Sequence, residues 1–353
     1  AAGDARPDAR PAPVTGPRLG FVIVALFVSI LLSALDQNIF STAMPTVVGD
    51  LSGVDQMLWV TTAYLVAGTI MMPIYGKLGD LVGHKPLLLS ALALFLGGSL
   101  LGGLSPDMGV LITARTMQGL GGGGLLILSQ SVIADLVPPR RRGTYMGIMA
   151  GAWAVAAVLG PVLGGGFADS IGWRWAVWVN LPLGLIAVIA VSAFLRRPAR
   201  RRTRLTLDMP GMVMLVVATA SLILVISWGG REYAWGSPLI LGLLALTIVA
   251  GTLLVLWERR AAEPVIPLRL FHDRNFNLAT AGALLSSLAF LGVVVYMPTY
   301  LQMVTGLSAT KAGLLIVPLA AGIQVGSLGS GILASRTGRY RWMPATSVAL
   351  IGV

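Results

Sequence analysis

Residues 19–45 read LGFVIVALFVSILLSALDQNIFSTAMP and contain a single charged side chain, that of Asp36. Crossing the hydrocarbon core of a bilayer takes about 20 consecutive, mostly apolar residues in a helix. A charged side chain is rare inside such a stretch, because moving it from water into lipid costs on the order of several kcal/mol. The stretch therefore predicts a membrane-spanning helix that carries one acidic group.

Similar apolar stretches fill most of the remaining chain, and an eleventh begins near Trp342. The expected spans after the first are 57–79, 86–105, 108–134, 144–168, 175–195, 209–229, 237–257, 276–300 and 309–334. Apolar residues make up 56% of the chain and charged residues 11%, whereas a soluble domain carries roughly 25% charged residues. The sequence predicts an all-α integral membrane protein.

The composition excludes several classes of function. The chain has no cysteine and only two histidines, His84 and His272, far apart in sequence. Disulfides, thiol chemistry and metal sites built from Cys or His are therefore not expected. The glycines at 121–124 lack the following Lys and Ser or Thr of a phosphate-binding loop. We expect no enzyme activity, no bound cofactor and no metal.

Basic residues alternate between the loops in a regular way. Lys and Arg gather before the first expected span and in the loops after the second, fourth, sixth, eighth and tenth, whereas the other loops carry mainly acidic residues such as Asp50 and Asp107. Cytoplasmic loops of membrane proteins are enriched in Lys and Arg. This pattern predicts a cytoplasmic N-terminus, and it explains the net charge of +11 by topology rather than by nucleic-acid binding.

Part of the sequence repeats. GKLGDLVGHK at residues 76–85 is matched in spacing by GILASRTGR at residues 331–339. Both segments follow spans that are expected to cross the membrane in the same direction. The sequence therefore predicts two related halves, as in many transporters. With six helices in a half, spans 209–229 and 237–257 form an insert, a complete protein would have fourteen helices, and this sequence stops inside its second half.

These boundaries give the expected organisation of the chain. It comprises a disordered cytoplasmic tail (1–18), an N-terminal six-helix bundle (19–195), a basic cytoplasmic loop (196–207), two linker transmembrane helices (208–257), a cytoplasmic loop (258–275) and the start of a truncated C-terminal bundle (276–353).

Four motifs stand in a recognisable order. They are Leu35-Asp36-Gln37-Asn38-Ile39 continuing to Pro45, the loop Gly76 to Pro86, Arg115-Thr116-Met117-Gln118-Gly119 with the glycines that follow, and Gly160-Pro161-Val162-Leu163-Gly164-Gly165. The first, third and fourth are similar to the patterns LDxTIVNVALP, RxxQGxGG and GPxxGG. The chain thus resembles the major facilitator superfamily, specifically its fourteen-spanner drug:proton antiporters of the EmrB/QacA type. The resemblance implies that superfamily's helical bundle.

The resemblance implies proton coupling by Asp36 and Arg115. The pKa of a carboxyl group in general rises on desolvation and falls beside a cation, so making and breaking a contact with Arg115 would let such a group take up and release a proton. Counting 1.5 Å per residue places Asp36 roughly 14 Å from Pro45 and Arg115 roughly 11 Å into its span. Both then lie in the outer half of the membrane. A static ion pair that only locks the helices remains an alternative.

Further roles follow from the same resemblance. Gln37, Asn38 and Gln118 are expected at the substrate cavity. Gly160, Pro161, Gly164 and Gly165 form the antiporter motif, in which proline kinks the helix, glycines allow close packing, and the direction of transport is export.

The loop after the second expected span resembles a cytoplasmic latch between helix ends. Its candidate residues are Gly76, Asp80, Gly83 and Lys85, with Asp135 and residues 140–142 as partners. Leu81 and His84 stand where the family commonly has Arg. The alternative is that these charges only fix orientation. The stretch from Trp173 to Pro182 also fits the family, and we interpret it as an interfacial aromatic anchor rather than a site.

The sequence therefore predicts a secondary active exporter, driven by the proton gradient, that moves an amphiphilic small molecule out as protons enter. An uptake symporter or uniporter of the same fold, and a membrane receptor or scaffold without transport, remain alternatives. The expected partners are the substrate, protons and the lipid bilayer, with no nucleic acid. We expect a monomer in a bacterial plasma membrane, and accessory export proteins are left open.

Overall fold

The structure is a computed structural model that describes residues 17–195, 208–261, 264–305, 317–337, 342, 343 and 346. Several expectations lie outside these residues. They are nearly all of the tail 1–18, the basic loop 196–207, the first part of the span 309–334 and most of the span after Trp342.

The described residues form helices, with no β-strand among them. The first part of the chain holds α1 (Pro17–Asp50), the one-turn η1 (Val54–Gln56), α2 (Met57–Val82), α3 (His84–Gly103), α4 (Met108–Leu136), α5 (Pro139–Asp169), α6 (Trp175–Trp178) and α7 (Asn180–Phe194). The rest holds α8 (Met209–Trp228), α9 (Pro238–Glu258), η2 (Leu268–His272), α10 (Arg274–Thr305) and α12 (Val317–Thr337). The all-α prediction is confirmed.

The expected span 175–195 is divided into two helices. In a continuous helix, the amide of residue 182 would donate a hydrogen bond to the carbonyl of Trp178. Pro182 has no amide hydrogen, and a single residue with helical dihedral angles, Val179, separates α6 from α7. Together these two helices still form one apolar segment, and eight of the described segments are long and apolar enough to cross a bilayer.

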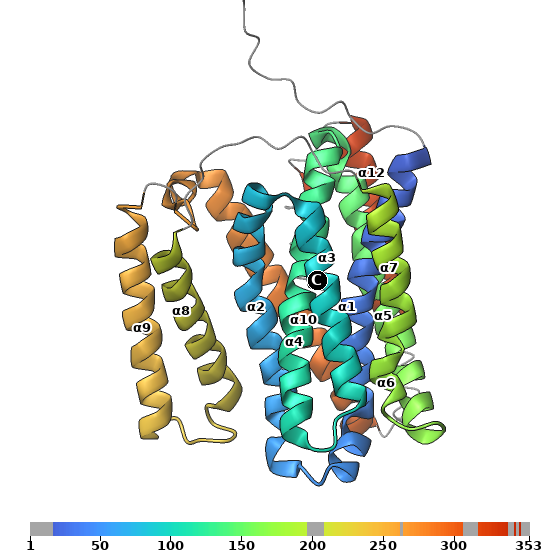
Figure 1. The fold of residues 1–353 in the computed structure, drawn as a ribbon. Coiled ribbons are helices and arrows are strands. Elements are labelled where there is room, and N and C mark those ends of the chain that lie inside the picture. Colours follow the sequence, from blue (N-terminus) through green and yellow to red (C-terminus); the bar gives the residue numbers. More distant parts are fainter. Residues whose placement is uncertain are drawn as a thin grey trace, which may run out of the picture.

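The bundle has two chemically different ends. α1 ends at Asp50 and α4 begins after Asp107, and we call this the acidic end. α3 begins beside Lys85 and α5 begins with a row of arginines at 140–142, and we call this the basic end. Figure 1 shows the long helices running between the two ends.

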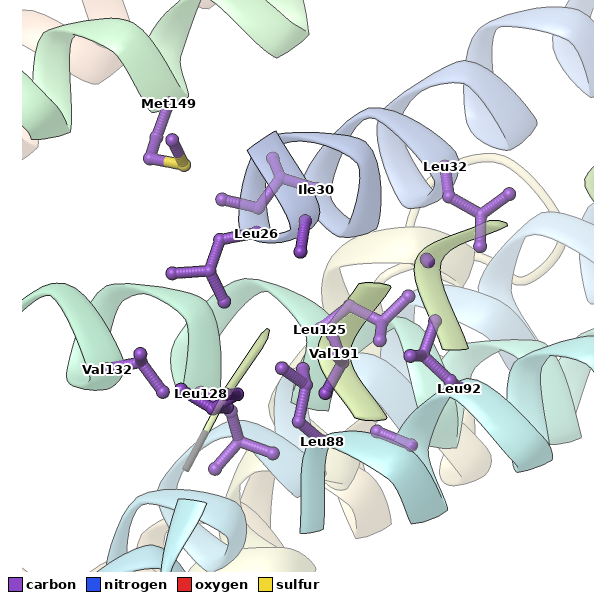
Figure 2. Close-up of a cluster of buried hydrophobic side chains, with 14 of the residues drawn as sticks. Leu26, Ile30, Leu32, Leu88, Leu92, Leu125, Leu128, Val132, Met149 and Val191 are labelled. Carbon is purple, nitrogen blue, oxygen red and sulfur yellow. The ribbon is translucent and has the colours of Figure 1, made fainter. Parts of the chain in front are cut away.

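The interior of the six-helix bundle contains two apolar clusters. The larger lies toward the basic end and joins α1, α2, α3, α4, α5 and α7. Figure 2 shows Leu26 of α1, Leu88 of α3, Leu128 of α4 and Met149 of α5 within it. The second lies toward the acidic end, around residues 34–48 of α1. Asp36 falls where the two clusters meet along α1.

Consecutive glycines allow α4 to pack tightly between α2 and α3. A methyl group added at Gly123 would overlap the carbonyl oxygen of Gly68 in α2, and one added at Gly121 would come 2.5 Å from the carbonyl oxygen of Ala91 in α3. Glycines are enriched where membrane helices approach this closely. The run Gly121–Gly124 is therefore a packing surface that fixes the positions of α2 and α3 around α4.

α8 and α9 form a hairpin at the side of the bundle, next to α2 (Figure 1). Within the hairpin, the Thr247 hydroxyl donates to the Ser221 hydroxyl at 2.8 Å. At the acidic end, the rings of Trp59 in α2 and Trp228 in α8 meet edge to face, with centroids 4.6 Å apart. Trp228 is buried in this contact, so it joins the hairpin to the bundle rather than lying in a lipid interface.

α12 packs along α5 near the basic end. The Thr144 hydroxyl of α5 donates to the carbonyl oxygen of Gly331 at 3.3 Å, and a methyl group added at Gly331 would come 2.6 Å from the carbonyl oxygen of Gly143. The repeated segment that begins at Gly331 thus lies at the same end of the bundle as its counterpart at Gly76. This contact joins α5 and α12 at the basic end.

Candidate functional site

Asp36 is completely buried in the middle of α1, although it is a carboxylate. Arg115 of α4 is 3% exposed, and its Nη1 atom donates to Oδ2 of Asp36 at 2.6 Å. Removing one partner of a buried ion pair leaves an uncompensated charge and costs about 3–5 kcal/mol. The pair therefore ties α1 to α4 at a point from which water is excluded.

The second oxygen of Asp36, Oδ1, accepts two amide hydrogen bonds. Gln118 Nε2 donates to it at 3.0 Å, and Asn180 Nδ2 donates at 2.7 Å. Arg115 Nη1 also donates to Gln118 Oε1 at 2.8 Å. Both carboxylate oxygens of Asp36 therefore have hydrogen-bond donors inside the bundle.

Ser99 of α3 completes the group. Its hydroxyl accepts from Gln118 at 2.8 Å and from Asn180 at 3.2 Å, and it donates to the carbonyl oxygen of Phe95 at 3.0 Å. The five side chains, which we call the Asp36 network, come from α1, α3, α4 and α7. They are Asp36, Ser99, Arg115, Gln118 and Asn180. Side chains from four helices thus form one hydrogen-bonded group, in which α4 and α7 reach the Asp36 carboxylate directly and α3 supports them.

The guanidinium group of Arg115 lies between two aromatic rings. Its central carbon is 4.5 Å from the ring centroid of Phe40 and 4.4 Å from that of Tyr64. Cation–π contacts of this kind are worth about 2 kcal/mol or more when they are desolvated. The Arg115 Nε atom has no hydrogen-bond partner among the described residues, so the rings and the Asp36 network together hold the cation.

The structure separates the three expected cavity residues. Gln37 lines a pocket, where its amide nitrogen lies 3.4 Å from the Tyr64 hydroxyl. Asn38 instead donates to the carbonyl oxygen of Ala34 and packs against α5, and Gln118 is fully buried in the Asp36 network. Of the three, the pocket is lined by Gln37 alone.

The interpretation of the segment 173–182 as an aromatic anchor is wrong for two of its members. Asn180 is fully buried and contacts Asp36 directly. Trp173 is 3% exposed and donates its indole N–H to Asp50 at 2.9 Å, beside Arg174, which donates to the same carboxylate oxygen at 2.9 Å. Trp175 is exposed, as an anchor requires. The signal in the sequence was Asn180 itself, a polar residue two positions before Pro182, which was not interpreted as part of a site.

The antiporter motif lies where α5 crosses α1. A methyl group added at Gly160 would overlap Asn38, and one added at Gly164 would overlap the Ile39 carbonyl oxygen and the Thr42 hydroxyl. Gly165 has open space on its side, with nothing within 4 Å. Pro161 lies inside the helix and is exposed. Among the glycines of the motif, Gly160 and Gly164 are therefore the ones that lie against the backbone of the helix that carries Asp36.

Asp135, one of the expected partners of the candidate latch, contacts His84 rather than Asp80 or Lys85. The imidazole Nδ1 of His84 lies 2.9 Å from Asp135 Oδ2, whereas the Lys85 ammonium donates to the carbonyl oxygen of Ser192 in α7 at 2.7 Å. Asp80 is exposed and has no ion pair with the described residues. Of the arginines at 140–142, Arg142 donates to backbone carbonyls at the end of α4.

Two glycines of the latch have different surroundings. Gly83 adopts φ 92°, which a residue with a side chain rarely does, and makes the turn into α3. Gly76 has no atom within 4 Å of an added methyl group. The contact between His84 and Asp135 ties the turn at Gly83 to the end of α4.

The fold and the buried network define a class of protein: a polytopic helical bundle built around a carboxylate in its apolar core. The profile of the Major Facilitator Superfamily matches residues 26–353. The chain therefore belongs to this superfamily, whose members are transporters and not enzymes, and it is a multi-pass membrane protein.

Relatives and a solved structure agree with this assignment. The chain is 39% identical to an uncharacterized MFS-type transporter of Mycobacterium tuberculosis, covering 97% of this chain and 50% of that protein. It is 36% identical to the multidrug transporter protein MdtP of Bacillus subtilis, covering 90% of this chain and 58% of that protein. It thus spans about half the length of these relatives.

A solved structure shows the same fold. The crystal structure of the human organic anion transporter MFSD10 superimposes with a TM-score of 0.60 over 95% of this chain and 75% of that one. At 18% identity, this similarity concerns the arrangement of helices and not the substrate.

Proposed function

We propose that the protein is a secondary active exporter, in which proton entry drives the exit of amphiphilic small molecules. The observation that carries the proposal is the fully buried pair of Asp36 and Arg115 between α1 and α4. A buried carboxylate within a membrane-spanning helix is a functional group by default. The name of the B. subtilis relative, a multidrug transporter, supports drug-like substrates.

The geometry suggests how a proton would act. Protonation neutralises Asp36 and removes the charge that holds the Arg115 guanidinium at 2.6 Å. The arginine then keeps its contacts with Phe40 and Tyr64, and the attraction between α1 and α4 becomes weaker. Since α5 lies in backbone contact with the same part of α1 through Gly164, the change reaches the helix that also contacts α12.

The wider architecture belongs to the proposal as well. The α8–α9 hairpin lies between the six-helix bundle and the later helices in sequence, as a fourteen-helix antiporter of the EmrB/QacA type requires. We propose a cytoplasmic N-terminus, which the basic loops support through the positive-inside rule. We further propose a monomer in a bacterial plasma membrane, with the proton gradient as its energy source and no bound cofactor.

Everted membrane vesicles test the direction and the energy source of transport. Vesicles that contain the full-length protein are expected to accumulate ethidium when respiration energises them, and to release it when a protonophore collapses the gradient. Vesicles prepared without the protein are the control. Accumulation in right-side-out vesicles instead would identify an uptake symporter. Absence of flux in both orientations across a panel of amphiphilic compounds would favour a receptor or scaffold.

A further inference from the structure

The α8–α9 hairpin carries an open groove of about 440 Å³ along α9. Its lining includes Ile248, Gly251, Val255 and Leu256, and it ends at Arg259, directly after the helix. These residues recur every three or four positions, so they share one face of α9. A methyl group added at Gly251 would have no atom within 4 Å, so the missing side chain keeps the middle of the groove open. Figure 1 shows α9 on the far side of α8 from the bundle.

The groove is apolar along its length and cationic at one end. Ile248, Val255 and Leu256 are exposed among the described residues. The hydroxyl of Thr252 donates to the carbonyl oxygen of Ile248 at 2.7 Å, so this polar group of the lining already has a partner. Arg259 is exposed and forms no ion pair with the part of the chain that the structure describes. Its charge is therefore available to a ligand that enters the groove.

Two acidic residues lie close to this end of the hairpin, and neither lines the groove. Glu258 is 4% exposed and accepts a hydrogen bond from a backbone N–H of the following loop at 3.1 Å. Asp208 accepts from the indole N–H of Trp257 at 2.7 Å. Both carboxylates are thus engaged within the hairpin, and the end of the groove presents Arg259, followed by the exposed Arg260. The local charge is complementary to an anion.

The length of the groove matches one leaflet of a bilayer. Thr247 and Arg259, at its two ends, are twelve positions apart, or roughly 18 Å at 1.5 Å per residue. Half of a hydrocarbon core of about 30 Å is roughly 15 Å. Since α9 ends at the basic end of the bundle, an acyl chain whose headgroup lies at Arg259 would follow the groove to the middle of the membrane.

We propose that this groove binds an anionic phospholipid, with its phosphate on Arg259 and one acyl chain along α9 toward Ile248. Guanidinium and phosphate groups form charge-assisted hydrogen bonds that are frequently bidentate, and basic sites at the cytoplasmic side of membrane helices bind such headgroups. Lipid tails are as apolar as the wall of the groove, so the groove holds the chain by fit and the charge selects the lipid. This role of the hairpin does not depend on the export function.

Native mass spectrometry of the purified full-length protein in detergent tests the headgroup site. The probes are dioleoylphosphatidylglycerol, which is anionic, and dioleoylphosphatidylcholine, which is zwitterionic. The wild type should bind the anionic lipid about fivefold more tightly, the usual contribution of one basic residue near a charged membrane surface. Arg259→Gln should lose most of this preference. Arg231→Gln, at an exposed position at the acidic end of the same hairpin, is the matched control and should keep it.

The acyl-chain site is tested by Gly251→Leu, which places a side chain in the middle of the groove. We expect this variant to bind both lipids about threefold more weakly, as for the loss of a few van der Waals contacts, and to keep the preference for the anionic lipid. Gly242→Leu, at an exposed position of α9 outside the groove, should bind both lipids like the wild type. Both glycines have open space around them, so both variants are expected to fold.

Three results would overturn the proposal. Equal losses of preference in Arg259→Gln and Arg260→Gln, with no effect of Gly251→Leu, would show a diffuse attraction by charge rather than a site. A dimeric full-length protein that Gly251→Leu converts to a monomer, with unchanged lipid binding, would show that a second copy covers the groove. Unchanged binding of both lipids in Arg259→Gln and Gly251→Leu would show that no lipid binds there.

Discussion

Arg115→Ala is expected to lower the free energy of unfolding by about 3–5 kcal/mol, the usual cost of breaking a buried ion pair from one side. The substitution leaves the Asp36 carboxylate with two amide donors and no counter-charge, in a site with no exposure. It also removes the cation from between the rings of Phe40 and Tyr64. Thermal and chemical unfolding of the purified protein in detergent measures the loss.

Arg174→Ala is the matched control for this prediction. Arg174 also donates to a carboxylate, that of Asp50, but the two side chains are 39% and 48% exposed. Exposed ion pairs contribute about 0–1 kcal/mol, so this variant should remain close to the wild type. Adding Asp36→Asn to Arg115→Ala should recover part of the lost stability, because it removes the orphaned charge. Equal losses for the two Arg variants would contradict a buried pair.

Gly164→Val is expected to destabilise the protein by about 3 kcal/mol, at the upper end of the cost of overpacking, and to abolish export. Position 164 faces the backbone of α1 at Ile39 and the hydroxyl of Thr42, and a side chain there must push α5 away from α1. This displacement would alter the packing of the segment of α1 that begins just after Asp36. Unfolding and ethidium transport measured on the same preparation give both effects.

Gly165→Val tests whether the effect belongs to the contact or to the loss of a glycine. The next residue in the same helix has open space on its side, so the identical substitution should cost much less in stability. A Gly165→Val variant as damaged as Gly164→Val would show that flexibility of α5, rather than its contact with α1, is what the glycines provide.

Much of the fold could be predicted because membrane-spanning helices obey a simple rule of length and polarity. The described helices fall on the expected spans, since about 20 apolar residues have few other stable arrangements. Asp36 and Arg115 could be proposed as neighbours because both are charged and both lie at a similar depth. Depth follows from counting residues along a helix, which needs no knowledge of the partner helix.

The rest of the Asp36 network could not be predicted, because it depends on how each helix is rotated about its own axis. Asn180 reaches Asp36 from the first residue of α7, and which way it faces depends on how α7 packs against α1. Ser99 is one of many small polar residues in apolar helices. Tyr64 lies against Arg115, next to the network, because Gly119 and Gly122 bring α4 against α2, which depends on packing between distant segments.

The pairing of side chains in the latch, at the surface, could not be predicted either. Counting charges predicted the region but not the pairing, and the pair formed is His84 with Asp135. Lys85, one residue further, points toward α7 and bonds to Ser192. Adjacent residues in a helix point about 100° apart, so a shift of one position changes the partner helix.

The central claim is that Asp36 couples proton movement to export, and one measurement tests it most directly. Proteoliposomes containing the full-length wild type, Asp36→Asn or Asp55→Asn are given an imposed pH gradient, and uphill ethidium transport is followed. The wild type and Asp55→Asn, which alters an exposed carboxylate outside the bundle core, should concentrate the dye. Asp36→Asn should let ethidium equilibrate but never concentrate it. Undiminished uphill transport by Asp36→Asn would contradict the account.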